Sequence, residues 1–73
     1  MYTLTVTTHT EIKKSWNFIE LAYACDMFSF AITCEDCANA VIIDGMTGEL
    51  VKEWDYKDGL TIFTDHGEIH LFI

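Results

Sequence analysis

The chain lacks proline and arginine altogether, and it is poor in cations: four lysines stand against twelve acidic residues, for a net charge of −8. Binding to a phosphate backbone needs clustered cations that release counterions, and Lys13-Lys14 is the one such pair in the sequence. The same shortage disfavours adsorption to an anionic membrane surface. We therefore expect no direct nucleic-acid binding and no membrane binding. Acidity of this degree suits a basic protein surface, or serves solubility.

Cysteine is scarce as well. The chain has three: Cys25, Cys34 and Cys37. An odd number argues against a closed disulfide framework. The beginning of the sequence shows neither the basic nor the apolar segment of a secretory signal. The longest stretch of low polarity, residues 21–33, contains Asp26 and is too short to cross about 30 Å of hydrocarbon. These features favour a reducing, cytoplasmic location.

Apolar residues, in contrast, are abundant for so short a chain, at 51% of 73 residues. For a mass of 8.4 kDa, surface scaling predicts about 4,600 Å² exposed after folding, with roughly 62% of the unfolded surface buried. We expect a single domain spanning residues 1–73, with a marginal core that needs a disulfide, a metal or association for stability. Because the apolar surface exceeds what one small core buries, oligomerisation is predicted.

Alternating polarity predicts strands at the beginning of the chain. Tyr2, Leu4 and Val6 alternate with threonines over residues 2–7, which is typical of a half-buried strand. A weaker alternation over residues 12–16 follows a polar turn. The two runs together predict a β-hairpin.

A helix is expected next. Asn17 has the character of an N-cap, and Glu20 three residues later completes a capping box. Apolar residues then recur at helical spacing, which predicts a helix from Phe18 to about Cys34. The remaining helix surface is apolar as well, notably at Tyr23, Met27 and Phe30. One buried stripe cannot cover all of these, so we expect the helix to be covered on more than one side.

Four more strands are predicted over residues 38–43, 49–56, 60–64 and 68–73, separated by turns that contain glycine. The last hairpin has two alternative registers. A two-residue loop at His66-Gly67 pairs Phe63 with His70, and a three-residue loop pairs Phe63 with Ile69. The predicted fold class is α+β: a single antiparallel sheet (β-β-α-β-β-β-β, with a meander after the helix) and one helix packed on one face.

One helix can cover only one face of a sheet, so the second sheet face is a candidate interface. In either register the last hairpin keeps large apolar residues on both faces. Helix and sheet together provide six interface candidates: Phe30, Met27, Tyr23, Phe63, Phe72 and Val51. We predict that they bind a second copy, giving a homodimer, or another protein.

Acidic residues follow the predicted strand 49–56 and the turn after it. There are four candidates for contact with a partner: Glu49, Glu53, Asp55 and Asp58. The first three share one strand face because they are spaced by even numbers of residues. They form either a solvated sheet face or a negative stripe directed at a basic protein.

Cys34 and Cys37 have the spacing of paired metal ligands, and His66 with His70 would complete a Cys₂His₂ zinc site. Zinc fingers, however, place their histidines on a helix, whereas these two lie across a predicted turn and strand. Cysteine is also a common small core residue. A small zinc protein is therefore kept as the alternative, and no cofactor or metal is part of the main prediction.

Residue patterns that identify a reaction are missing from the sequence. It contains neither a nucleophile elbow nor a phosphate-binding glycine loop, and each of the four glycines is explained by a turn. We accordingly predict a non-enzymatic protein–protein interaction module that is acidic and self-associating, with a basic protein surface as a further partner.

Overall fold

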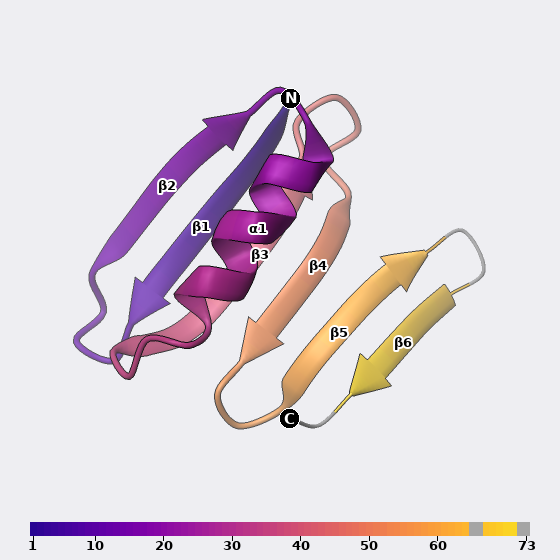
Figure 1. Cartoon of the computed structure of the whole chain (residues 1–73). Coiled ribbons are helices and arrows are strands. Elements are labelled where there is room, and N and C mark those ends of the chain that lie inside the picture. Colours follow the sequence, from indigo (N-terminus) through magenta and orange to yellow (C-terminus); the bar gives the residue numbers. More distant parts are fainter. Residues whose placement is uncertain (65–66, 72–73) are drawn as a thin grey trace.

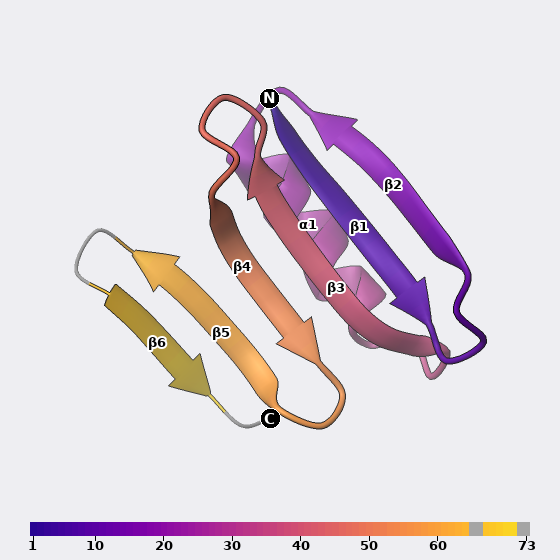
Figure 2. The same ribbon diagram turned by 180° about the vertical axis from the view of Figure 1, so that it is seen from behind.

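The computed structural model describes residues 1–64 and 67–71. The elements in this part of the chain are β1 (Tyr2–Thr8), β2 (Lys13–Phe18), α1 (Leu21–Ala31), β3 (Cys37–Asp44), β4 (Leu50–Asp55), β5 (Gly59–Thr64) and β6 (Gly67–Leu71). The six strands form one antiparallel sheet in the order β2-β1-β3-β4-β5-β6. α1 packs on one face of this sheet (Figures 1 and 2). The predicted α+β fold class and its order of elements are confirmed.

The position of the helix follows from the order of the first strands. β2 and β3 flank β1 and are both antiparallel to it, so they run parallel to each other. Parallel strands need a crossover connection in place of a tight turn, and α1 supplies it by lying over β1 to β3 (Figure 1). The strands from β3 to β6 follow one another through short connections. As a result, α1 does not extend over β4 to β6.

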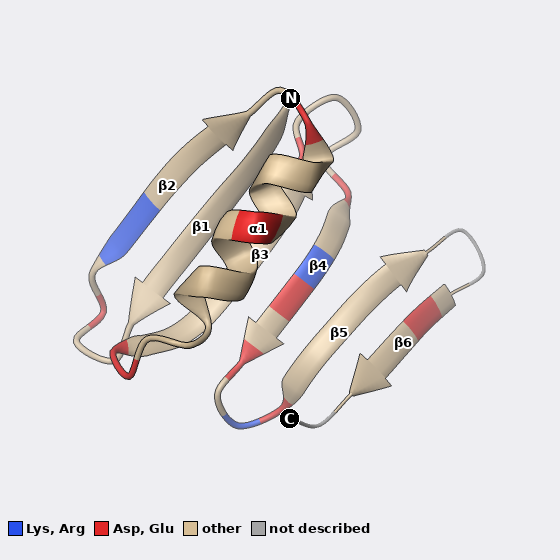
Figure 3. Ribbon diagram, viewed as in Figure 1, with Lys and Arg blue, Asp and Glu red and all other residues tan. Residues whose placement is uncertain are grey.

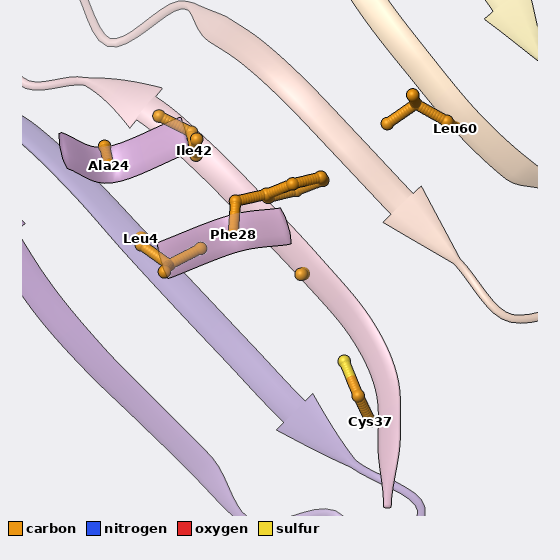
Figure 4. Close-up of a cluster of buried hydrophobic side chains, with 7 residues drawn as sticks. Leu4, Ala24, Phe28, Cys37, Ile42 and Leu60 are labelled. Atoms are coloured by element: carbon orange, nitrogen blue, oxygen red, sulfur yellow. The ribbon is translucent and has the colours of Figure 1, made fainter. Parts of the chain in front are cut away.

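The core lies between α1 and the middle of the sheet (Figure 4). Ala24 and Phe28 of the helix are fully buried together with Leu4 of β1 and Ile42 of β3. A spacing of four residues puts Ala24 and Phe28 on one face of α1, and that face contacts the sheet. The buried hydrophobic residues of the described chain are Leu4, Ala24, Phe28, Cys37, Ala40, Ile42 and Leu60.

The helix begins later than the sequence predicted. Asn17, the expected N-cap, belongs to β2, where it pairs with Thr3 and accepts a hydrogen bond from the Thr3 hydroxyl at 2.8 Å. Because pairing with β1 satisfies the backbone at this point, the capping box does not form and α1 begins at Leu21. The helix also ends earlier than expected, at Ala31 and not at Cys34.

The last hairpin adopts neither of the two predicted registers, because Phe63 pairs with Glu68. Residues 65–66 and 72–73, which include His66 and Phe72, lie outside the described part of the chain. The observed register aligns apolar residues across the two strands in two pairs: Leu60 with Leu71, and Ile62 with Ile69. These pairs share the helix side of the sheet, so a slip by one residue would separate them.

The sheet face opposite the helix carries polar pairs as well as apolar side chains. The Thr5 and Ser15 hydroxyls lie 3.0 Å apart on it, beside the Thr3–Asn17 hydrogen bond. Three strand residues with exposed large apolar side chains lie on the helix side instead: Trp16, Ile69 and Leu71. The second sheet face, expected as a candidate interface, carries half-buried Phe63 and exposed Leu50. The register gathers further apolar side chains on the side where α1 packs.

Candidate protein interaction surface

The outer surface of α1 is apolar and exposed. Tyr23 and Phe30 are 62% and 68% exposed, and Met27 between them is 37% exposed. Spacings of four and three residues place these side chains next to one another on the helix. On the opposite side of α1, Ala24 and Phe28 are buried against the sheet. A helix that is apolar around most of its circumference is normally buried on all sides, and this one is buried on one.

A groove runs along α1 on the side that faces β2. It comprises two hollows of about 740 and 400 Å³, and both are lined by Met27 and Phe30. Tyr23 lines the larger hollow, and Trp16 of β2 lines the smaller. Charged side chains also line the groove: Lys14, Glu20, Asp26 and Asp36. An extended apolar groove with a few charged groups is the form of surface that takes up a protein segment.

A second apolar surface lies on the other side of α1. We call it the wing: the helix-side face of β4, β5 and β6, formed by Trp54, Ile62, Ile69 and Leu71. Ile69 and Leu71, on the last strand of the sheet, are 49% and 47% exposed. Trp54 and Ile62 are half-buried against the edge of the core. α1 does not cover the wing (Figure 1), so it is an apolar sheet face without a partner within the described chain.

Two residues of opposite charge lie on the helix side of the sheet, Lys52 at the boundary between α1 and the wing and Asp26 on the outer side of α1. Lys52 of β4 is on the helix side, and its Nζ lies 4.9 Å from the centre of the Phe28 ring. Asp26, two residues before Phe28, is exposed on the outer side of α1. Figure 3 shows the acidic residue on α1 and the lysine on β4. The cation–π contact with Phe28 holds the Lys52 ammonium at the inner edge of the wing.

The remaining interface candidates from the sequence lie elsewhere. Val51 is at the irregularity in the β3–β4 pairing, where it is half-buried and packs against the core. Phe63 is half-buried on the sheet face opposite the helix. Phe72 lies outside the described residues. Of the six candidates, the structure brings together the three on α1.

The acidic candidates gather in part. Glu53, Asp55 and Asp58 line one hollow of about 190 Å³ on the sheet face opposite the helix, whereas Glu49 is apart from them. His70 lines the same hollow, and its Nδ1 lies 2.8 Å from the Thr61 hydroxyl. The hollow thus combines three carboxylates with groups able to hydrogen-bond, and it points away from α1 and the wing.

Of the four residues of the zinc alternative, the three that the structure describes are not brought together as that alternative requires. Cys37 is buried in the core at the beginning of β3, and Cys34 is exposed in the turn before it. His70 lies three strands away on the other face of the sheet, and His66 is outside the described residues. Within residues 1–64 and 67–71, the acidic, histidine and cysteine side chains form no group of three that could hold a metal ion.

Cys37 behaves as a core residue. Burial raises the pKa of its thiol, the hydrogen bond to the Asn39 carbonyl at 3.6 Å acts in the opposite direction, and nearby Cys34 adds to the rise. A thiol in this environment is held in its neutral form, which is the inert form. The small-core-residue interpretation therefore describes Cys37 better than the ligand interpretation does.

Three exposed residues on the helix side of the sheet were not among the interface candidates predicted from the sequence: Trp16, Ile69 and Leu71. A signal for the last two was present. Residues 60–62 and 69–71 have the same apolar-polar-apolar pattern, so a register that aligns the two patterns puts four apolar side chains on one face. Of the two registers considered from the turn sequence, the two-residue loop also puts these four side chains on one face, with partners shifted by two residues, whereas the three-residue loop does not.

Comparison with protein-family models, with curated proteins and with solved structures gave no match. In the described residues, no helix has the length and apolar character needed to cross a membrane. What the chain does is accordingly inferred from its own surfaces.

Proposed function

We propose that this protein is a non-enzymatic protein–protein interaction module whose helix side binds another protein surface. The observation that supports this is the exposed apolar surface of α1 and of the sheet on both sides of it. The chain exposes 5135 Å², which is about 500 Å² more than the ~4,600 Å² expected for its mass. Soluble monomers rarely leave contiguous apolar patches of more than a few hundred Å² in water, so a partner that covers this side is expected.

The chemistry of the groove favours binding over catalysis. Aromatic, methionine and aliphatic side chains supply most of its lining, with Trp16, Tyr23 and Phe30 the largest. Side chains of this kind are enriched in the cores of protein interfaces, where they contribute by leaving water. The charged residues that line the groove would then orient the partner.

The acidic hollow supports a second contact, with a basic protein. Glu53, Asp55 and Asp58 line it on the opposite face of the sheet, so it stays accessible when the helix side is occupied. Complementary charge of this kind steers association and selects partners. We include a basic surface as the second partner type of the same module.

Site-specific photo-cross-linking tests the main proposal. A benzophenone amino acid in place of Phe30 lies on the helix side, whereas the same group in place of Thr5 lies on the polar sheet face. In cells that produce the chain, we expect protein adducts from position 30 and few from position 5. Equal yields at both positions, or no adduct at position 30, would refute the proposal. The adduct mass separates a second copy of this chain from a different protein.

A further inference from the structure

We infer that the partner on the helix side is a second copy of this chain. Two copies would associate face to face about a two-fold axis that runs alongside α1, so that each α1 lies over the wing of the other copy. This inference rests on the proposed function and specifies the partner.

The first support for this dimer is that the helix side consists of two halves, one covered by α1 and one not. α1 covers β1 to β3, and the wing occupies β4 to β6. A rotation by 180° about an axis between these halves exchanges them, so each copy presents its helix where the other copy presents its bare strands. The contact is isologous and closes on itself. It buries at once the two apolar surfaces that the monomer leaves exposed.

The residues on the two halves fit each other. Tyr23 and Phe30 are on the outer side of α1, and β5 and β6 of the second copy would lie over them. There, Ile62, Ile69 and Leu71 offer an aliphatic surface. Each helix would then be packed between two sheets, which is the environment that a helix apolar on most sides requires.

The flank of α1 that faces the wing would lie beside the second helix. Met27 lines the β2 groove, so by helical geometry the opposite flank carries Ala22 and Ser29. Both are small and exposed. Small side chains at this place let the two helices lie side by side without displacing the sheets.

Charge gives the arrangement a specific contact. A two-fold axis parallel to α1 keeps each residue at its height along the helix, so Lys52 of the second copy lies level with Phe28 of the first. Asp26 is about half a turn from Phe28 and is exposed on the outer side of α1, which faces the second copy in this arrangement. The symmetry therefore creates two Asp26–Lys52 pairs between copies.

The net charge of −8 does not oppose this contact strongly. Glu53 and Asp55 of β4 and Glu68 of β6 are on the other face of the sheet, where they point away from the second copy. Charges separated by more than about 10 Å in water are largely screened at ordinary salt concentration. These three acidic residues thus stay in solvent on the two outer faces of the dimer.

The available area is also sufficient. The two longest dimensions of the chain are 30 and 24 Å, which in projection is about 700 Å², and a standard stable interface buries about 600–1,000 Å² on each partner. A face-to-face contact that uses most of the helix side reaches this size. Pairing through the β6 edge alone would leave α1 and its groove uncovered.

Analytical ultracentrifugation of the full chain over a concentration series tests the inference. We expect a monomer–dimer equilibrium that Phe30→Asp and Ile69→Asp each weaken by about tenfold or more, since each places a charge in the apolar contact. The matched control is Met46→Asp, which adds the same charge at a side chain 88% exposed in the β3–β4 turn. The Met46→Asp variant should dimerise with the same affinity as the unaltered chain. Far-ultraviolet circular dichroism of each variant confirms that the monomer is folded.

A charge exchange tests the geometry itself. Asp26→Lys and Lys52→Asp should each weaken the dimer, because each brings like charges together across the contact, and the double variant should recover most of the loss. A general loss of folding would not be rescued in this way.

The outcomes are separable. A chain that stays monomeric at every concentration refutes self-association, while adducts of another mass from position 30 would leave the proposed function standing. A dimer that tolerates Phe30→Asp, or a double variant no better than the single ones, refutes the face-to-face arrangement in favour of another contact such as β6 edge pairing. Absence of both the dimer and the adducts refutes the proposed function as well.

Discussion

Replacing Phe28 by alanine should remove a large part of the stability of this domain. The Phe28 ring is fully buried between α1 and the sheet, and core Phe→Ala substitutions cost about 3–5 kcal/mol. The Lys52 ammonium 4.9 Å from the ring loses its contact too, which adds about 0.5–1 kcal/mol. At about 0.05–0.15 kcal/mol per residue, a chain of 73 residues has roughly 4–11 kcal/mol in total. The variant is therefore expected to be marginal or unfolded at room temperature.

Urea unfolding followed by the fluorescence of Trp16 and Trp54 measures the loss. Phe30→Ala is the matched control, because it makes the same chemical change on the same helix at a side chain 68% exposed. In dilute monomer it should cost no more than about 1 kcal/mol. If the alanine variant does not fold, Phe28→Leu replaces it, with an expected loss of about 1–1.5 kcal/mol in the free energy of unfolding. Equal losses at positions 28 and 30 would refute the burial of Phe28 between α1 and the sheet.

Two further substitution sets probe the thiols and the turns. Cys34 should react with iodoacetamide much faster than buried Cys37, and mass spectrometry of digested protein shows which thiol is alkylated first. Because burial raises the pKa of Cys37, the folded state binds the thiol proton more tightly than the unfolded state does. The free energy of unfolding is therefore retained below the ordinary thiol pKa of about 8.5 and falls as the pH rises above it. Cys37→Ala should flatten that decline, and an unchanged decline would assign it to other groups. Gly45→Ala should lower the melting temperature by about 4–8 °C for each kcal/mol lost, because its Cβ would lie 2.8 Å from the Met1 carbonyl oxygen. Gly48→Asn is the control, since asparagine tolerates the φ of 74° at an open position, and an equal loss there would contradict the proposed clash.

The sequence predicted the interior of each element better than its ends. Period-two alternation from Tyr2 places Leu4 in the core, and helical spacing places Ala24 and Phe28 there as well. The beginning of the helix was mispredicted because Asn17 suits both an N-cap and a polar strand face. Pairing with Thr3 decides between the two, and that pairing depends on residues fourteen positions away.

The order of the strands had no local signal. Either edge of the β1–β2 hairpin is a possible neighbour for β3, and the choice depends on where α1 crosses the sheet. Once β3 lies beside β1, α1 packs on β1 to β3 and leaves the same face of β4 to β6 uncovered. The exposed helix residues Tyr23 and Phe30 were therefore predicted as surplus apolar surface. For Ile69 and Leu71 the apolar character was evident from the sequence, but their place on the helix side depends on the register of the last hairpin. Their role in an interface stays a prediction.

The central position of β1 also constrains the order in which the chain folds as it leaves the ribosome. β1 is synthesised first, but one of its two neighbours is β3, and its first residue, Tyr2, pairs with Asp44. The β1–β2 hairpin is a two-stranded unit with marginal stability of its own, so it must wait for the whole crossover to emerge before it gains its second partner and its helix. The meander from β3 to β6 needs only local contacts, which form faster. During synthesis, the pairing of β1 with β3 is therefore slow and long-range, and it is the step that commits the nascent chain to its fold.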